Sequence, residues 1–263
     1  MQARRAPQST SKSSIRAELS DSVKFLRAAV AETLWPSRCV VCDLPGDALC
    51  PSCALNLPFI DQLRACPVCG APWGRTICCE CNQQTLRWKG LERFPLDGCA
   101  SAVALAPETK KIVTAFKDQG ERQLARIIAH YLAEVLPPAW RKQAALVPIP
   151  ARSTAVRQRG FDHVALITAE LAHLTNTPVL PLLAAKPRKD QRNLDAQQRL
   201  ANMAGSFALA EAKRTALQAR LRFFPHVILV DDVFTTGATL FTAAETLKPL
   251  GPEKTYTLTF IRA

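Results

Sequence analysis

Two neighbouring carboxylates followed by a run of small hydroxyl residues form the stretch of this chain best suited to chemistry. Asp231 and Asp232 follow the apolar run 227–230, and the turn after them contains Thr235, Thr236, Gly237, Ala238 and Thr239. The apolar periodicity of 238–248 predicts a helix directly after this turn. In an α/β fold, the backbone N–H groups of such a turn and the positive end of the helix dipole bind a phosphate.

The two carboxylates narrow the class of ligand. They repel a bare phosphate, so the ligand should also carry hydroxyl groups that donate hydrogen bonds to them, or bring a divalent metal ion. A ribose 5-phosphate combines phosphate and hydroxyls in one molecule. A Walker loop is excluded because Ala238, and not lysine, follows Gly237, and a dinucleotide-binding loop needs three spaced glycines. A polar turn without function is the remaining alternative.

Eight of the ten cysteines form four C-x2-C pairs, and this spacing is typical of zinc sites. The pairs are Cys39/Cys42, Cys50/Cys53, Cys66/Cys69 and Cys78/Cys81. Four thiolates close a tetrahedral site around one ion, so eight predict two structural zinc ions. We favour an arrangement in which the first two pairs bind one ion and the last two pairs the other, over a cross-braced arrangement. Cys79 could compete as a ligand. A module this short lacks a core, so metal binding should supply its folding energy.

Three further segments contain cations that could hold a diphosphate. They are Lys117 next to Gly120, Arg152 with Arg159 after a predicted strand end, and Arg188 within the basic segment 186–199. Each alone is an ordinary solvated charge. Next to the 231–239 loop, however, the arginines could bind a diphosphate bidentately, and segment 186–199 could cover it as a lid. His163 lies near this loop cluster and is expected to be an ordinary surface histidine.

From residue 99 onward, apolar strands alternate with helices, which predicts an α/β fold with a mainly parallel sheet flanked by helices. The expected strands are 99–106, 145–149, 179–183, 203–209, 226–230 and 256–261. The expected domains are a disordered tail at 1–14, an amphipathic helix at 15–36, a double zinc ribbon at 37–85 and the α/β domain at 95–263. A chain of 263 residues is long enough for such a domain and a smaller one.

Charge and hydropathy restrict the class of protein further. The formal net charge of +12 suits an anionic ligand, either a diphosphate or a nucleic acid. No apolar run approaches the length that a membrane span needs. Paired cysteines without a preceding hydrophobic signal segment predict metal binding in the reducing cytoplasm.

The stretch 227–239 resembles the loop with which type I phosphoribosyltransferases bind 5-phosphoribosyl diphosphate (PRPP). The shared features are four apolar residues, two acids and a turn of threonine and glycine. This resemblance implies that Asp231 and Asp232 contact the ribose hydroxyls and that residues 235–239 bind the 5-phosphate. It defines the superfamily but not the reaction.

From about residue 34 to its end, the chain resembles the ComF family, competence-associated proteins that join a double zinc ribbon to a phosphoribosyltransferase domain. The matching segments are Leu34-Trp-Pro-Ser-Arg-Cys-Val-Val-Cys42, Phe116-Lys-Asp-Gln-Gly120, Val147-Pro-Ile-Pro150, Arg159-Gly-Phe161, Gln191-x2-Leu194-x4-Arg199-x2-Asn202 and Leu229-Val-Asp-Asp-Val-Phe-Thr-Thr-Gly-Ala-Thr239. The family usually has Asn-Gln where this chain has Asp162-His163. The resemblance implies PRPP bound with Mg²⁺, its diphosphate near 150–159, Lys117 beside the phosphates and a lid over 188–199.

Two functions from different classes follow. The first is a phosphoribosyltransferase that transfers the 5-phosphoribosyl group of PRPP to an unidentified acceptor. The second is a non-catalytic protein that keeps the PRPP-type pocket for regulation and binds single-stranded DNA together with the DNA-uptake machinery. Release of diphosphate from PRPP, lost in Asp231→Asn/Asp232→Asn, favours the first. Salt-sensitive binding of single strands, lost on charge reversal at Arg188 and Lys189, favours the second.

Overall fold

The computed structural model describes residues 37–186, 205–210 and 219–263. The chain divides into two units, residues 1–51 and 52–263, which are described separately. The predicted tail at 1–14, the predicted helix at 15–36 and the predicted lid residue Arg188 lie outside the described residues. The domain boundaries drawn from the sequence stay predictions.

The described part of the first unit is a short loop that turns back on itself. Arg38 and Pro45 form an isolated antiparallel bridge, and the Cys39 N–H donates to the Leu44 carbonyl at 2.9 Å. At the tip, the Asp43 N–H donates to the Cys39 carbonyl at 2.7 Å. These bonds form a tight knuckle that holds Cys39 and Cys42 on one turn.

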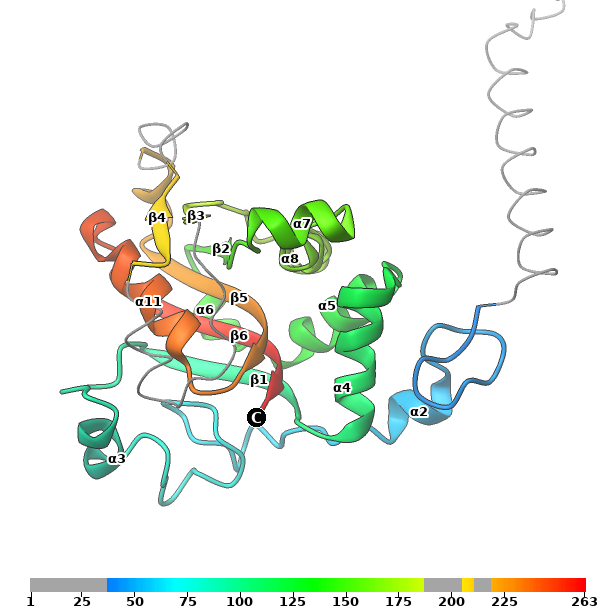
Figure 1. The fold of residues 1–263 in the computed structure, drawn as a ribbon. Helices are drawn as coiled ribbons and strands as arrows, with labels where there is room; N and C mark the ends of the chain where they lie inside the picture. The colour runs from blue at the N-terminus through cyan, green and yellow to red at the C-terminus, as the bar shows by residue number, and fades with distance from the viewer. Residues whose placement is uncertain (1–36, 187–204, 211–218) are drawn as a thin grey trace, which may run out of the picture. The chain divides into compact units, whose positions relative to one another are not determined.

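A four-stranded parallel sheet forms the centre of the second unit (Figure 1). Its strands, in spatial order, are β1 (Gly98–Ala104), β6 (Lys254–Arg262), β5 (His226–Phe234) and β2 (Ala144–Pro148). All three neighbouring pairs are parallel. The bounds of β1, β2 and β6 lie within two residues of those predicted. The predicted fold class, a mainly parallel sheet flanked by helices, is confirmed.

Strand β5 is longer than predicted. It continues past Val230 to Phe234 because its ladder with β6 also continues, pairing Asp231 with Thr259 and Phe234 with Arg262. Asp231 and Asp232 therefore lie inside the strand and not after it.

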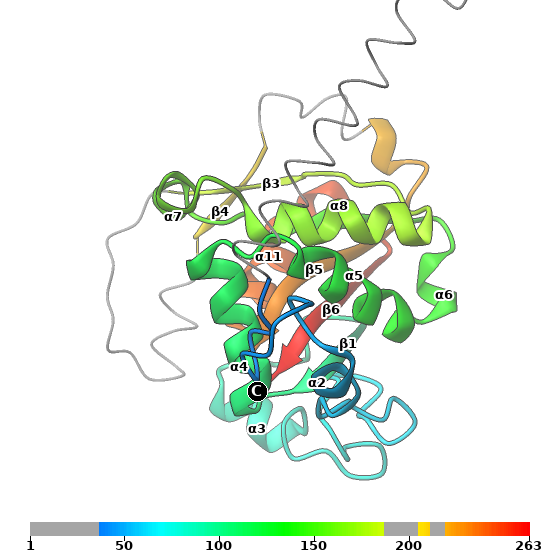
Figure 2. The same ribbon diagram turned by 90° about the vertical axis from the view of Figure 1, so that its right-hand side faces the viewer.

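Helices cover both faces of the sheet. Helices α5 (Leu124–Val135) and α8 (His163–Thr175) pack side by side on one face, and α11 (Ala238–Leu247) lies on the other (Figures 1 and 2). Helix α5 has the apolar stripe that such packing requires, with Leu124, Ile128 and Leu132 fully buried at every fourth position.

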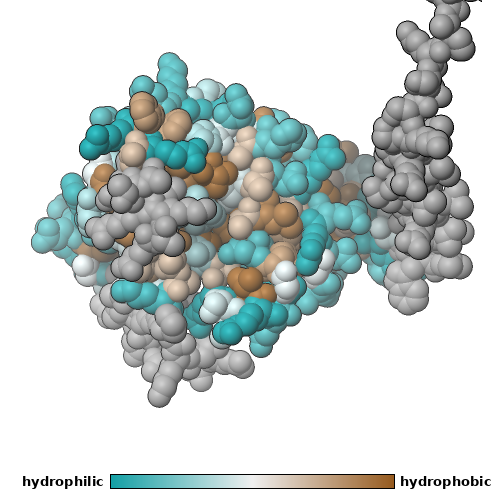
Figure 3. Space-filling view, turned by 90° about the horizontal axis from the view of Figure 1, so that it is seen from above, coloured by the Kyte–Doolittle hydropathy of each residue, from teal (hydrophilic) through white to brown (hydrophobic). Residues whose placement is uncertain are grey.

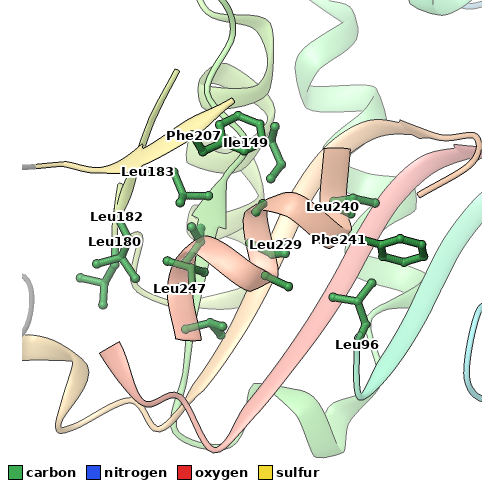
Figure 4. Close-up of a cluster of buried hydrophobic side chains, with 14 of the residues drawn as sticks. Leu96, Ile149, Leu180, Leu182, Leu183, Phe207, Leu229, Leu240, Phe241 and Leu247 are labelled. Carbon is green, nitrogen blue, oxygen red and sulfur yellow. The ribbon is translucent and has the colours of Figure 1, made fainter. Parts of the chain in front are cut away.

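The core beneath α11 joins the helix to the sheet. Leu240 and Leu247 of α11 pack with Leu229 of β5, and Phe241 lies beside Leu96 (Figure 4). Each of these side chains is at least 94% buried. Burial of apolar surface of this kind supplies most of the stability of such a fold, so the turn before α11 starts from a rigid base.

Two segments were predicted as strands at 179–183 and 203–209, and of their described residues only Leu183 and 207–209 belong to a separate small sheet. Strands β3 (Leu183–Ala185) and β4 (Phe207–Leu209) pair antiparallel, whereas Val179 makes only an isolated bridge to Leu146 of β2. Pro178 and Pro181 lie on either side of the pair Val179–Leu180 and have no N–H to donate, which disfavours a longer ladder there.

The remaining elements are short. They are α2 (Pro51–Leu55), α3 (Gln83–Trp88), α4 (Pro107–Thr114), the π-helical turn η1 (Ala115–Gln119), α6 (Pro138–Arg141), α7 (Ser153–Arg159) and the 3₁₀ turn η3 (Lys248–Leu250). Within the described ranges, no helix has the length and apolar character that crossing a bilayer requires. On the face seen from above, hydrophilic side chains surround patches of hydrophobic ones (Figure 3).

Candidate functional site

A cavity of about 390 Å³ opens where β5 and β2 end. The sequence-predicted residues that line it are Lys117, Arg152, Arg159, Asp231, Asp232 and Thr239. The carboxyl ends of parallel strands are where α/β proteins bind ligands, and the cavity volume is in the range of small-molecule sites. The other predicted ligand contacts are residues 235–238. Residues 235–237 form the turn between β5 and α11, and Ala238 is the first residue of α11.

The two aspartates are buried next to each other. Asp231 is 8% and Asp232 4% exposed, and the Asp232 N–H donates to Asp231 Oδ1 at 2.9 Å. Burial, followed by the charge of Asp232, raises the pKa of Asp231 well above its ordinary value, although Lys117 opposes the shift. Two adjacent buried carboxylates are costly for a ligand-free protein, which indicates a functional reason for their presence.

Lys117 supplies the cation that faces these acids. Its ammonium group forms an ion pair with Asp232, and both residues line the cavity. The lysine belongs to the π-helical turn η1, which Gly120 ends in the left-handed conformation with φ of 79°. Such turns are rare and occur frequently at functional sites. The ion pair therefore lies within the candidate site and does not draw Asp232 away from it.

His163 is buried, contrary to the expectation of a surface histidine. Its Nε2 lies 3.7 Å from Asp232 Oδ2, and its Nδ1 lies 3.4 Å from a guanidinium nitrogen of Arg159. Burial lowers the pKa of His163, while the nearby Asp232 raises it to a smaller extent. A sequence signal existed: His163 lies four residues before Ile167, in the buried stripe of α8. Sequence reasoning did not extend that stripe back to the first turn.

The neighbouring Asp162 explains the start of α8. Its Oδ1 accepts a hydrogen bond from the Ala165 N–H at 3.0 Å, as an N-cap does, and its Oδ2 accepts one from the Ala151 N–H at 3.2 Å. Asp162 therefore ties the helix to the segment that follows β2. At the two positions where this chain departs from the ComF pattern, one residue fixes α8 and the other faces the cavity.

The buried histidine gives a pH prediction. Because the folded-state pKa of His163 is lowered, the folded protein binds fewer protons than the unfolded chain at and below about pH 6.5. Stability should therefore fall as the pH falls through this range, and His163→Gln should make that fall shallower. Urea unfolding at several pH values tests this, with the exposed His130→Gln as the matched control. Equal pH profiles for both variants would contradict the assignment.

The arginines predicted in a loop lie on or next to a short helix. Arg152 is the N-cap of α7, and Arg159 is its last residue, so the helix presents both at the cavity. Arg159 also lies 3.4 Å from a carboxylate oxygen of Asp118. The ribbon β3–β4 contributes Lys186, which sequence reasoning placed in the lid, and Ser206 and Phe207, which it did not single out as ligand contacts.

Gly237 makes the turn between β5 and α11 possible. It has a φ of 83°, and a Cβ built on it would lie 2.5 Å from the ring of Phe241. The Phe241 N–H donates to the Gly237 carbonyl at 2.8 Å, which starts the helix. The turn can approach the helix this closely only because position 237 has no side chain.

Gly237→Ala should therefore destabilise the protein by about 2 kcal/mol, from backbone strain together with the clash against Phe241. Urea unfolding measures this loss. Gly251→Ala is the matched control, because Gly251 also has a positive φ but has no atom within 4 Å of the added Cβ. If the two variants lost equal stability, the clash with Phe241 would have no part in the effect.

The eight paired cysteines form two four-thiol clusters in sequential order. Within each group, Cys39/Cys42/Cys50/Cys53 and Cys66/Cys69/Cys78/Cys81, the sulfurs lie within 4.8 Å of one another. The Cys42–Cys50, Cys66–Cys81 and Cys69–Cys78 sulfur distances are 3.7, 3.6 and 3.5 Å. Ligands of a tetrahedral zinc ion are about 3.8 Å apart, so both clusters fit one zinc each.

The other two cysteines have different surroundings. Cys79 is exposed and belongs to neither cluster, and Cys99 is buried in the core beneath α11. The clusters contain only thiol groups, so each would close around a bound ion without an open position for a substrate. Both therefore have the character of structural sites.

These features define a class: a parallel α/β domain with a polar cavity at its strand ends and two zinc-ribbon-like cysteine clusters in the N-terminal part of the chain. No family model matches the sequence. Competence protein ComFC of Bacillus subtilis is 25% identical over 79% of this chain and 80% of its own length. Competence protein F of Haemophilus influenzae is 25% identical over 82% of this chain and 93% of its own length. DNA utilization protein YhgH of Salmonella typhi is 26% identical over 81% of this chain and 91% of its own length. The similarity to these relatives, together with the two cysteine clusters, supports the resemblance to the ComF family.

Proposed function

We propose that this protein binds PRPP together with Mg²⁺ in the cavity at the end of β5. One observation carries the proposal: two buried carboxylates face the same cavity as four cations, Lys117, Arg152, Arg159 and Lys186, next to the turn that starts α11. A ligand with hydroxyls at its centre and phosphates at both ends matches this distribution of charge.

Each part of the site then has a role. Asp231 and Asp232 accept hydrogen bonds from the ribose hydroxyls, which compensates for their burial. The N–H groups of residues 235–239, at the N-terminus of α11, bind the 5-phosphate. Arg152 and Arg159 on α7 bind the diphosphate, with Arg188 as a further contact. Mg²⁺, when bound together with PRPP, would neutralise part of the negative charge of the diphosphate.

The reaction that this site favours is transfer of the 5-phosphoribosyl group with departure of diphosphate. Such a transition state has oxocarbenium character, so the protein contributes by holding the leaving diphosphate and excluding water from C1. The ion pair of half-buried Lys117 with buried Asp232 supports this proposal, because its charges would lie close to the proposed ribose subsite. No general base is required for the departure of diphosphate.

The names of the relatives support a role connected with DNA. Two are called competence proteins and one a DNA utilization protein. We infer that this chain also acts in DNA uptake or utilization in the cytoplasm. The alternative function is regulatory: a PRPP-type pocket without catalysis, in a protein that binds single-stranded DNA.

A diphosphate-release assay separates the two functions. The protein is incubated with PRPP and Mg²⁺, with and without single-stranded DNA, next to the Asp231→Asn/Asp232→Asn variant. Release that the variant loses supports transfer. PRPP binding without release, together with salt-sensitive DNA binding, supports the regulatory function. The absence of both binding and release would contradict the proposal.

A further inference from the structure

Arg262, at the end of β6, is a buried cation that contacts the start of the turn between β5 and α11. It is 3% exposed, and its guanidinium group lies 4.1 Å above the ring of Phe234. One of its nitrogens donates to the carbonyl oxygens of Phe234, at 3.4 Å, and of Thr235, at 3.2 Å. The same nitrogen donates to the main-chain oxygen of Ala263 at 2.7 Å. Arg262 therefore fixes the backbone where the turn 235–239 begins.

The other end of this guanidinium group contacts the second cysteine cluster. Its Nη2 forms an ion pair with Glu80, which lies between the cluster residues Cys78 and Cys81. The backbone N–H of Glu80 points to the Cys78 sulfur at 3.4 Å. The main chain of Glu80 is thus held by a metal-ligand sulfur, while its side chain holds Arg262.

A second contact connects the same two regions. Phe94 packs against the second cluster and meets the ring of Phe241 edge-on, with the ring centres 5.3 Å apart. The Phe241 ring is the group that lies against Gly237 in the turn. The second cysteine cluster consequently supports the turn at two points. Through Glu80 and Arg262 it holds the carbonyl groups of Phe234 and Thr235, and through Phe94 and Phe241 it contacts Gly237.

We propose that the second cysteine cluster positions the phosphate-binding turn, and that Glu80 and Arg262 are the positioning residues that connect them. The proposal rests on the function assigned to the turn above. Among the described residues, no hydrogen-bond partner is found for Arg262 Nε, so the ion pair with Glu80 and the carbonyl contacts hold this buried cation. Without the charge of Glu80, the guanidinium group moves toward water and releases the carbonyls of the turn.

The first test needs no ligand. Hydrogen–deuterium exchange is measured on the zinc-loaded protein and on Glu80→Gln, which keeps the size of the side chain and removes its charge. We expect the backbone amides of 235–239 to exchange about tenfold faster in the variant. Glu92→Gln, with the same change at an exposed carboxylate, is the matched control and should not change them. Unchanged exchange in Glu80→Gln would overturn the proposal.

The second test separates positioning from general loss of structure. Ribose 5-phosphate and magnesium diphosphate are titrated separately, because only the first needs the turn. Glu80→Gln should weaken ribose 5-phosphate binding about tenfold and change diphosphate binding by less than about twofold. Equal weakening of both, or of neither, would overturn the proposal. A zinc content of two ions per chain verifies that the variant keeps both clusters.

These measurements distinguish failure of this proposal from failure of the PRPP assignment. If the unmodified protein bound neither ligand while exchange in Glu80→Gln still rose at 235–239, the PRPP assignment would be wrong and the connection would stand. If the unmodified protein bound both ligands and Glu80→Gln behaved identically, the connection would be wrong and the PRPP assignment would stand.

Discussion

Asp231→Asn should weaken the binding of magnesium-bound PRPP by about 100-fold while making the ligand-free protein more stable near neutral pH. The loss of affinity follows because a charged acceptor of ribose hydroxyl bonds is replaced by a neutral one. The gain in stability follows from the pKa of Asp231, which burial and the neighbouring Asp232 raise well above its ordinary value. Asparagine has a similar shape and still accepts the bond that the Asp232 N–H donates.

A carboxyl group whose folded-state pKa is raised contributes stability that is fully present below its unfolded pKa of about 3.9 and is lost as the pH rises through the folded pKa. The stability advantage of Asp231→Asn should therefore be larger near pH 7.5 than near pH 5. Urea unfolding at both pH values and calorimetric titration with PRPP measure the two effects.

The exposed Asp47→Asn is the matched control, because it removes a carboxylate charge far along the sequence from the turn. It should change neither stability nor affinity beyond experimental error. A loss of both stability and affinity in Asp231→Asn would contradict the account, since it would mean that the carboxylate serves the fold. A carboxylate that destabilises its own protein is best explained by a ligand that compensates for it.

The second large effect concerns the cysteine clusters. Cys69→Ser should reduce the zinc content from two ions per chain to one and lower stability by roughly 5 kcal/mol. Cys69 is 1% exposed and belongs to the second cluster, where the surrounding chain has a small core that consists mainly of the cluster itself. Elemental analysis of the purified variant and its thermal unfolding measure the two quantities.

Cys79→Ser provides a demanding control for this prediction. It makes the same chemical change next to a cluster residue, but Cys79 is exposed and lies outside both four-thiol groups. The variant should keep two zinc ions and its stability. If Cys79→Ser lost an ion, the sequential assignment of ligands would be wrong.

The features that could be predicted from the sequence are those encoded by local spacing. The C-x2-C pairs are close enough in sequence to define knuckles, and the two clusters form in sequential order. The acids and small residues at 231–239 follow one another directly, so their closeness in space needed no knowledge of the fold. Lys117, Arg152 and Arg159 were each placed near strand or helix ends, and all three line the cavity.

The features that could not be predicted depend on contacts between distant parts of the chain. The extension of β5 through Phe234 requires its partner β6, whose register no local pattern gives. The position of His163 beside Asp232 depends on how α8 packs against β5. The ion pair of Glu80 with Arg262 joins a cysteine knuckle to the last strand, and neither residue stands in a motif.

The most direct test of the central claim is calorimetric titration of the zinc-loaded protein with PRPP in the presence of Mg²⁺. We expect saturable binding of one PRPP per chain, at the cavity that Asp231, Asp232 and Thr239 line. We also expect that Asp231→Asn/Asp232→Asn removes this binding while the protein remains folded with both zinc ions. Absence of PRPP binding by the unmodified, folded and zinc-loaded protein would contradict the central claim.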